Sequence, residues 1–382
     1  MSRKEHLYYV DLVRVLTVGL VIATHVLALA PFTPTVFFGA LTIAFHVSRE
    51  VFFLLTAFVL VYSTGQRKVR WPAFWRKRYL FVVVPYVTWT VLYFFANGGP
   101  FLGESFVHEL LTGTARYHLY FLLVSMQIYL VFPLIRSLLR HTVRYHGLLV
   151  VAGLAFQLVF SLAVQRGWSA GALSGWLQMP DPYLPSYLGY IVVGAVAARH
   201  RERLVAWTLR HARAVLAGCT IALAGGIGIY LAQVYAGGQP VLVAAFVFQP
   251  AVTIESFAVA WAFLTVGLLW QERGHPGEKV VRTTSDASFG IYLVHPLVLQ
   301  GALLGATSIG LVNLAQLVPN PLVLAVLILG LVPLIYLVSG MLTAAVRRTP
   351  ISLALTGRAW ARPAAPAQSR DELALATAGG TR

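Results

Sequence analysis

Apolar residues are gathered into ten long, nearly continuous stretches of this chain rather than placed at alternating positions. A transmembrane helix needs about 20 predominantly apolar residues, whereas membrane-spanning β-strands are alternating segments of about ten residues. The pattern therefore predicts an all-α, polytopic membrane protein, a bundle of about ten transmembrane helices. The expected segments are 8–30, 36–63, 79–96, 116–135, 147–165, a short sixth at 183–198, 212–235, 241–270, 288–308 and 321–345.

The amino-acid composition excludes a soluble globular domain and a disordered chain. Of the 382 residues, 58% are hydrophobic and only 11% are charged, whereas a soluble domain has about 25% charged residues. So high an apolar content also excludes an intrinsically disordered chain. The single cysteine, Cys219, rules out an intrachain disulfide and a cysteine-based metal site, and no P-loop, CxxC or HExxH motif occurs. No metal site is expected.

The distribution of basic residues predicts the topology. A net charge of +16 would suggest nucleic acid in a soluble protein, but in a membrane protein basic residues mark the cytoplasmic loops. With the N-terminus inside, 25 of the 29 Lys and Arg residues fall on the cytoplasmic side and two on the other side. We therefore expect a multi-pass protein of the cell (plasma) membrane with both termini in the cytoplasm. Residues 1–348 are the expected transmembrane domain, and the Ala/Pro/Arg-rich residues 349–382 are an expected disordered tail.

Charged side chains inside a membrane are energetically expensive, so each one is a candidate functional residue. Arg14 and His25 lie eleven positions apart, which is three helical turns plus about 20°, so both project from one face of the first segment. Their rise along the helix is about 16 Å. The alternative is structural: Arg14 would extend to the inner interface beside Asp11, and His25 would bond a backbone carbonyl.

The second segment adds three polar residues, His46, Arg49 and Glu50. His46 lies seventeen residues from the inner end of its segment, as His25 does, so both are expected at one depth in the outer half of the membrane. Because Arg49 and Glu50 are adjacent, they are expected to point about 100° apart and not simply to neutralise each other. At least one is expected to face a polar cavity, with an ion pair to another helix as the alternative.

Later segments supply further polar candidates, namely His118, Gln127, Glu255, Tyr292 and His295. The last two are expected in the inner half of the ninth segment. His295 precedes Pro296, so its alternative role is to bond a backbone carbonyl that the proline leaves without a donor. Together these residues predict a wet, polar interior, which fits an enzyme, a transporter or a flippase.

Four stretches carry longer patterns: YVDLVRVLTVGLVIATH, with Arg14 and His25; EVFFLLTAF; FWRKRYLFVVVPYV; and YHLYFLLVSMQIYLVFPL together with SFGIYLVHPL. In this order they resemble the acyltransferase-3 family of integral membrane acyltransferases, of the type that O-acylates surface polysaccharides. The resemblance spans about residues 5–345. The chain departs from the family at 56–57, where Thr-Ala replaces Ser-Gly, and at 125–126, where Ser-Met replaces residues that are acidic in many members.

The resemblance implies transfer of an acyl group, commonly acetyl, from cytoplasmic acyl-CoA (acetyl-CoA above all) to a hydroxyl of an extracytoplasmic or exported glycan. His25 is then expected to be a general base or an acyl carrier, because the pKa of histidine lies near neutrality. Arg14, with Arg76 and Arg78 of the following basic loop, is expected to hold the phosphates of acyl-CoA.

The remaining candidates receive supporting roles. Glu50 or Glu255 is expected to orient the ring of His25, and Arg49 or donors at the outer end of the fourth segment are expected to stabilise the oxyanion. The candidate substrate-binding residues are Arg49, His46, His118, Gln127, Tyr292 and His295. The expected partners are the lipid bilayer, acyl-CoA and a glycan or glycolipid acceptor, with no nucleic acid and no permanently bound cofactor.

The competing interpretation is a transporter or flippase for a lipid-linked saccharide. Such proteins carry interrupted helices in corresponding positions of two halves, and the Gly and Pro residues of this chain show no such pairing. Release of free CoA thiol from acyl-CoA by the purified protein separates the two interpretations, because only the enzyme cleaves the thioester.

Overall fold

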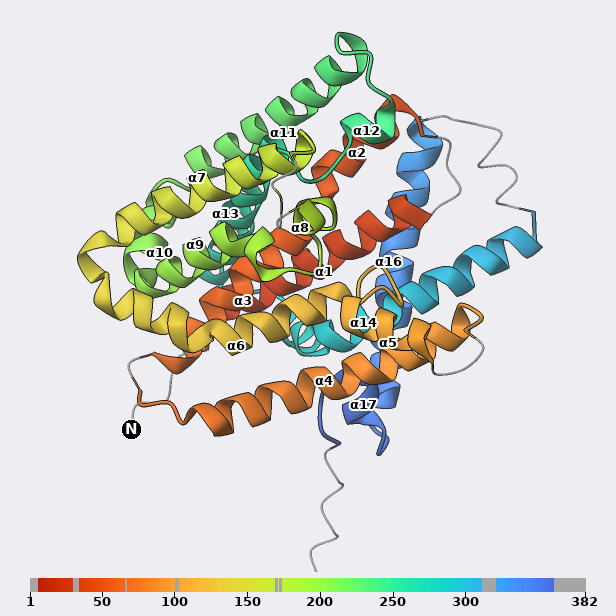
Figure 1. Cartoon of the computed structure of the whole chain (residues 1–382), viewed down its shortest axis with the longest axis horizontal. Coiled ribbons are helices and arrows are strands. Elements are labelled where there is room, and N and C mark those ends of the chain that lie inside the picture. The colour runs from red at the N-terminus through yellow and green to blue at the C-terminus, as the bar shows by residue number, and fades with distance from the viewer. Residues whose placement is uncertain are drawn as a thin grey trace, which may run out of the picture.

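The computed structural model of the protein describes residues 6–29, 34–65, 67–99, 103–168, 171, 174–310 and 321–360, which form helices joined by turns. Within these residues, nine helices are long and apolar enough to cross a membrane, which confirms the all-α, multi-pass prediction. Figure 1 shows them packed side by side in one bundle. They are α1 (Tyr8–Leu29), α2 with α3 (Val36–Phe45 and Ser48–Thr64), α4 (Trp71–Ala96), α6 (Tyr120–His141), α7 (His146–Gln165) with η1 (Val143–Tyr145), α11 (Ala212–Tyr235), α13 (Pro250–Glu272), α14 (Glu278–Ser308) and α16 (Pro321–Val346).

Shorter helices connect these spans. They are α5 (Glu104–Thr112), α8 (Ser174–Gln178), η3 (Leu184–Tyr187), α9 (Leu188–Arg199), α10 (Arg201–Arg210), α12 (Val241–Ala244) and α17 (Ser352–Thr356).

The expected sixth segment is present as α9, but it is shorter than a full membrane span. Its 12 residues rise only about 18 Å, against a hydrocarbon thickness of about 30 Å. The end of α9 nevertheless meets the start of α7, because His146 Nδ1 lies 2.7 Å from His200 Nε2. The chain thus returns through α9 to the end of the bundle at which α7 begins. The cytoplasmic location of both termini stays a prediction.

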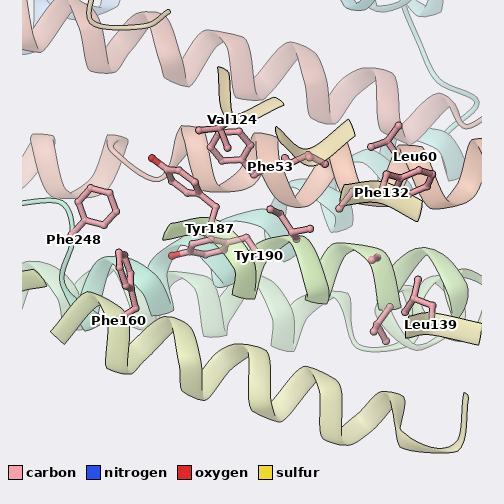
Figure 2. Packing of buried hydrophobic residues seen from close by; sticks show 14 of the residues in the cluster. Phe53, Leu60, Val124, Phe132, Leu139, Phe160, Tyr187, Tyr190 and Phe248 are labelled. Carbon is pink, nitrogen blue, oxygen red and sulfur yellow. The ribbon is translucent and has the colours of Figure 1, made fainter. Parts of the chain in front are cut away.

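Close backbone packing fixes α9 against α3 in the middle of the bundle. A methyl group on Gly194 of α9 would overlap the backbone oxygen of Leu54 in α3. Small residues allow such close approach between helices in a membrane, where van der Waals packing drives association. Around this contact, α3, α6, α7, η3 and α9 share an aromatic-rich cluster, shown in Figure 2, which includes Phe53, Leu60, Val124, Phe132, Leu139, Phe160, Tyr187, Tyr190 and Phe248.

The second predicted segment is interrupted between α2 and α3, at His46 and Val47. The hydroxyl of Thr24 in α1 donates to the Phe45 carbonyl at 2.8 Å, next to this break. The interruption places His46 and the first turn of α3 beside α1, deep inside the bundle.

The end of the described chain differs from the expected tail. Residues 352–356 form α17, which packs against α4 and α14 and lies below α4 in the view of Figure 1. The indole nitrogen of Trp89 donates to the Leu355 carbonyl at 3.1 Å, and the Ser352 and Thr356 side chains are buried. These residues therefore pack against the bundle, because the apolar run 351–355 finds a packing surface. Residues 361–382 lie outside the described residues, as do the basic residues at positions 3 and 4.

The contact between α3 and α9 gives a stability prediction. Replacing glycine by alanine inside a helix normally favours the helix by up to about 1 kcal/mol. At Gly194 the added methyl group has to push α9 away from α3, so Gly194→Ala is expected to lower the melting temperature in detergent by at least about 3 °C. Gly218→Ala on α11, where the methyl group meets no atom within 4 Å, is the matched control and is expected to melt no lower than the wild type. Equal melting of the Gly194→Ala variant and the wild type would contradict this packing.

Candidate active site

The centre of the candidate site is a hydrogen bond between histidines on two neighbouring helices. His25 and His295 each lie seventeen residues beyond the first residue of their helices, α1 and α14. Because α1 packs against α14, the two side chains meet: His25 Nδ1 lies 2.7 Å from His295 Nε2. The ring planes differ by 8° and the ring centroids are 5.0 Å apart, so the bond lies nearly in the plane of both rings.

This position of His295 corrects the expectation that it lies in the inner half of its segment. Helix α14 begins at Glu278 rather than at 288, because the polar sequence EKVVRTTSDA is also helical. Hydropathy alone does not reveal these first turns. With them included, His295 lies at the depth of His25.

A cavity opens beside His25 and brings together five of the predicted polar residues. Its walls come from α1, from the break between α2 and α3, from the start of α6 and from α14. His25 and His46 thus line one cavity, while their similar depth in the membrane stays a prediction. The polar lining residues are Thr24, His25, His46, Ser48, Arg49, Tyr117, His118, Tyr120 and Tyr292.

Several polar atoms on this lining have no hydrogen-bond partner among the described residues, although they are shielded from solvent. They are Nδ1 of His46, one terminal nitrogen of Arg49, the hydroxyl of Tyr117 and both ring nitrogens of His118. Weaker polar contacts reach three of these side chains, from Tyr120 to Arg49, from Arg116 to Tyr117 and from the Leu293 backbone to His118. A buried donor or acceptor without a partner costs about 1–3 kcal/mol. A set of five such atoms around one cavity is the arrangement expected of a binding site for a polar ligand.

Arg49 is held by two carboxylates and an aromatic ring. Its Nε donates to Glu50 at 2.5 Å, and a terminal nitrogen donates to Asp181 at 2.5 Å. The guanidinium carbon lies 4.1 Å from the ring centroid of Phe248. The expectation that adjacent Arg49 and Glu50 do not neutralise each other is therefore wrong, because the long arginine side chain bends back across the first turn of α3. Asp181 lies in the connection between α8 and η3, and no motif links it to Arg49 in advance.

The connection between α5 and α6 closes one side of the site. The Tyr117 ring meets the His25 ring edge-on, with centroids 4.5 Å apart. Arg116 lies over the Tyr117 ring at 5.4 Å, and the Tyr292 hydroxyl donates to the His118 carbonyl at 2.5 Å. Tyr117 was not among the sequence-based candidates, because a tyrosine near a helix end usually belongs to the interfacial aromatic belt.

Arg14 lies toward the N-terminal end of α1, in a basic region. It forms a 3.8 Å ion pair with Asp11, and its side chain is 34% exposed. Arg78 of α4 lies over the Tyr129 ring at 5.7 Å, and both Arg14 and Arg78 act electrostatically on that tyrosine. Arg76 is exposed on α4, two residues before Arg78. Arg14 and Arg78 therefore belong to one cationic surface below the cavity.

Gln127 and Glu255 are among the predicted residues that do not line the cavity. Gln127 braces the connection that carries Asp181, since its amide nitrogen donates to the Pro182 carbonyl at 2.7 Å and its oxygen accepts from the Leu184 amide at 2.8 Å. Glu255 of α13 is buried against Gly226 of α11, and neither of its oxygens has a partner among the described residues. In this structure the partner of the His25 ring is His295 rather than Glu50 or Glu255.

The fold and the site define a multi-pass membrane protein with a buried polar cavity around paired histidines. The acyltransferase-3 family model, described as an acyltransferase domain, matches residues 7–340. The chain belongs to this family and is therefore a transferase of acyl groups. Comparisons with curated proteins and with solved structures gave no match.

Proposed function

We propose that the protein is a membrane O-acyltransferase that moves an acyl group, acetyl in the simplest case, from acyl-CoA to a hydroxyl of an extracytoplasmic or exported glycan. The observation that carries the proposal is the cavity lined by His25 and by five polar atoms without partners. A sugar presents several hydroxyl groups, each of which donates and accepts hydrogen bonds. Such an acceptor satisfies these atoms, whereas an apolar acceptor leaves them unpaired.

The proposed donor enters from the side of Arg14. Acyl-CoA has an anionic nucleotide end and a long, thin pantetheine arm, and the planar fork of arginine suits phosphate oxygens. Arg14 and Arg78 hold the phosphates, and exposed Arg76 adds positive charge on α4. The rise of about 16 Å from Arg14 to His25 along α1 is then spanned by the pantetheine arm, which brings the thioester to His25.

The proposed chemistry uses His25 as the general base. The acceptor hydroxyl oxygen attacks the thioester carbonyl carbon, and its proton passes to His25. The unpartnered donors of Tyr117 and His118 stabilise the oxyanion. The C–S bond then breaks, and the CoA thiolate leaves with the proton that His25 had accepted. A route in which His25 first takes the acyl group itself uses the same residues.

The acceptor is bound by His46 and Arg49 in this proposal. His46 and Arg49 each present an unpartnered nitrogen to the cavity. Asp181, paired with Arg49, is half exposed on the connection between α8 and η3. This chain of polar groups leads from the cavity to a surface that the acceptor glycan reaches.

Replacement of His25 tests the proposed chemistry. Asn keeps part of the shape and hydrogen bonding of His, but it accepts no proton at neutral pH. His25→Asn is therefore expected to insert and purify normally while acylation falls at least about a hundredfold, within the range for a lost general base. His141→Asn, at an exposed histidine on the far end of α6, is the control and keeps wild-type activity. More than about a tenth of wild-type activity in His25→Asn would exclude the catalytic role.

Replacement of Arg14 tests donor recognition. Lysine keeps the charge but loses the planar fork, so Arg14→Lys is expected to raise KM for acyl-CoA about tenfold, the effect of one charged hydrogen bond, with kcat little changed. Arg140→Lys, on the exposed end of α6, is the matched control. Equal rates of the Arg14→Lys variant and the wild type at limiting acyl-CoA would rule out bidentate phosphate recognition by Arg14.

A further inference from the structure

Pro296 leaves one backbone carbonyl of α14 without its helical donor. In an α-helix the N–H of residue i bonds the carbonyl of residue i−4, which for position 296 is Tyr292. Proline has no N–H, so the Tyr292 carbonyl is free for another donor. His295 Nδ1 lies 2.7 Å from this oxygen. A carbonyl oxygen only accepts, so His295 Nδ1 must carry a proton.

The protonation of His295 Nδ1 determines the tautomer of His25. A neutral imidazole carries one N–H, so His295 Nε2 is then an acceptor. His25 Nδ1, 2.7 Å away, must donate to it. The neutral form is the one expected for His295, because its side chain is fully buried and a charge there is costly. His25 Nε2 is left as the unprotonated nitrogen of the ring that lines the cavity.

We propose that Pro296, the Tyr292 carbonyl and His295 form a relay that fixes His25 in the tautomer with an unprotonated Nε2, which makes His295 a positioning residue for acyl transfer. The catalytic part of this inference rests on the proposed function, whereas the tautomer itself does not. The nearly coplanar arrangement of the two rings supports it, because a hydrogen bond in the plane of both rings points directly at the lone pair of His295 Nε2.

The relay also accounts for the charge that His25 gains when its Nε2 accepts a proton during the reaction. When His25 Nε2 takes the proton of the acceptor hydroxyl, the Nδ1 proton moves toward His295 Nε2, and the positive charge is shared by the two rings. When the CoA thiolate takes the proton from Nε2, the Nδ1 proton returns to His25. One proton enters and one leaves, so the pair ends each turnover as it began. In a Ser-His-Asp triad, an aspartate holds the histidine tautomer in a similar way, and the wrong tautomer lowers kcat about 10⁴-fold.

The simpler explanation is that His295 only satisfies the Tyr292 carbonyl. The two explanations differ in what they predict for His295→Phe, which removes the acceptor, and for His295→Gln, whose amide oxygen can take the place of Nε2. The relay predicts that CoA thiol release from acetyl-CoA falls at least about a hundredfold in the Phe variant and keeps more than about a tenth of the wild-type rate in the Gln variant. Equal losses in both variants would contradict it.

Restoring the backbone donor separates the two explanations further. Alanine at 296 supplies an N–H that competes with His295 Nδ1 for the Tyr292 carbonyl, so Pro296→Ala is expected to lower the rate about tenfold. The double variant His295→Phe with Pro296→Ala is expected to be no faster than His295→Phe alone. If His295 only satisfied the Tyr292 carbonyl, Pro296→Ala would leave the rate unchanged and would restore the rate of the His295→Phe variant. Pro333→Ala, at another proline inside a helix, on the exposed surface of α16, is the matched control.

A spectroscopic measurement tests the relay without any substrate. In protein labelled with ¹⁵N-histidine, the His25 signals are assigned by their loss in His25→Asn. The relay predicts a protonated Nδ1 and an unprotonated Nε2 for His25 at neutral pH. The reverse tautomer would overturn the relay even if acyl transfer were observed. The predicted tautomer without thiol release from acetyl-CoA would instead refute the proposed donor and leave the relay in place.

Discussion

The organisation of this protein depends on one constraint: a polar side chain inside a membrane needs a polar partner within the protein. The hydrogen bond between His25 and His295 meets this constraint for two helices that are distant in sequence but adjacent in space. It ties α1 to α14 at the level of the cavity. Because α1 also carries Arg14, the same helix connects the cavity with the cationic surface below it.

Around the cavity, several polar side chains lack the polar partner that this constraint requires. Arg49 is neutralised by Glu50 and Asp181, so its charge is compensated, yet one of its nitrogens still lacks a partner. His118 and Tyr117 are also buried with unpaired atoms. A bundle selected only for stability has no reason to collect these atoms around one space. Together with family membership, they favour a site that is completed by a polar acceptor and a thioester.

The hydropathy pattern was sufficient for the all-α, multi-pass class, because the length and apolar character of a membrane helix follow from bilayer thickness. It also singled out His25 and His46, which line one cavity, whereas the shared face of Arg14 and His25 stays a prediction. It misplaced His295, since the first turns of α14 are polar and hydropathy does not report them. The Arg49–Glu50 pair depends on a side-chain bend, and Asp181 and Tyr117 reach the site through connections whose paths no periodicity encodes. The docking of α17 likewise depends on a surface formed only when α4 and α14 pack.

The central claim is that an acyl group enters beside Arg14 and leaves on an acceptor at the other side of His25. The most direct measurement supplies radiolabelled acetyl-CoA, which does not cross membranes, to sealed vesicles from cells that produce the protein. Inside-out vesicles, with the cytoplasmic surface exposed, are expected to incorporate label into enclosed carbohydrate, and vesicles carrying His25→Asn are expected not to. Equal labelling of right-side-out vesicles, or labelling that survives His25→Asn, would contradict the account.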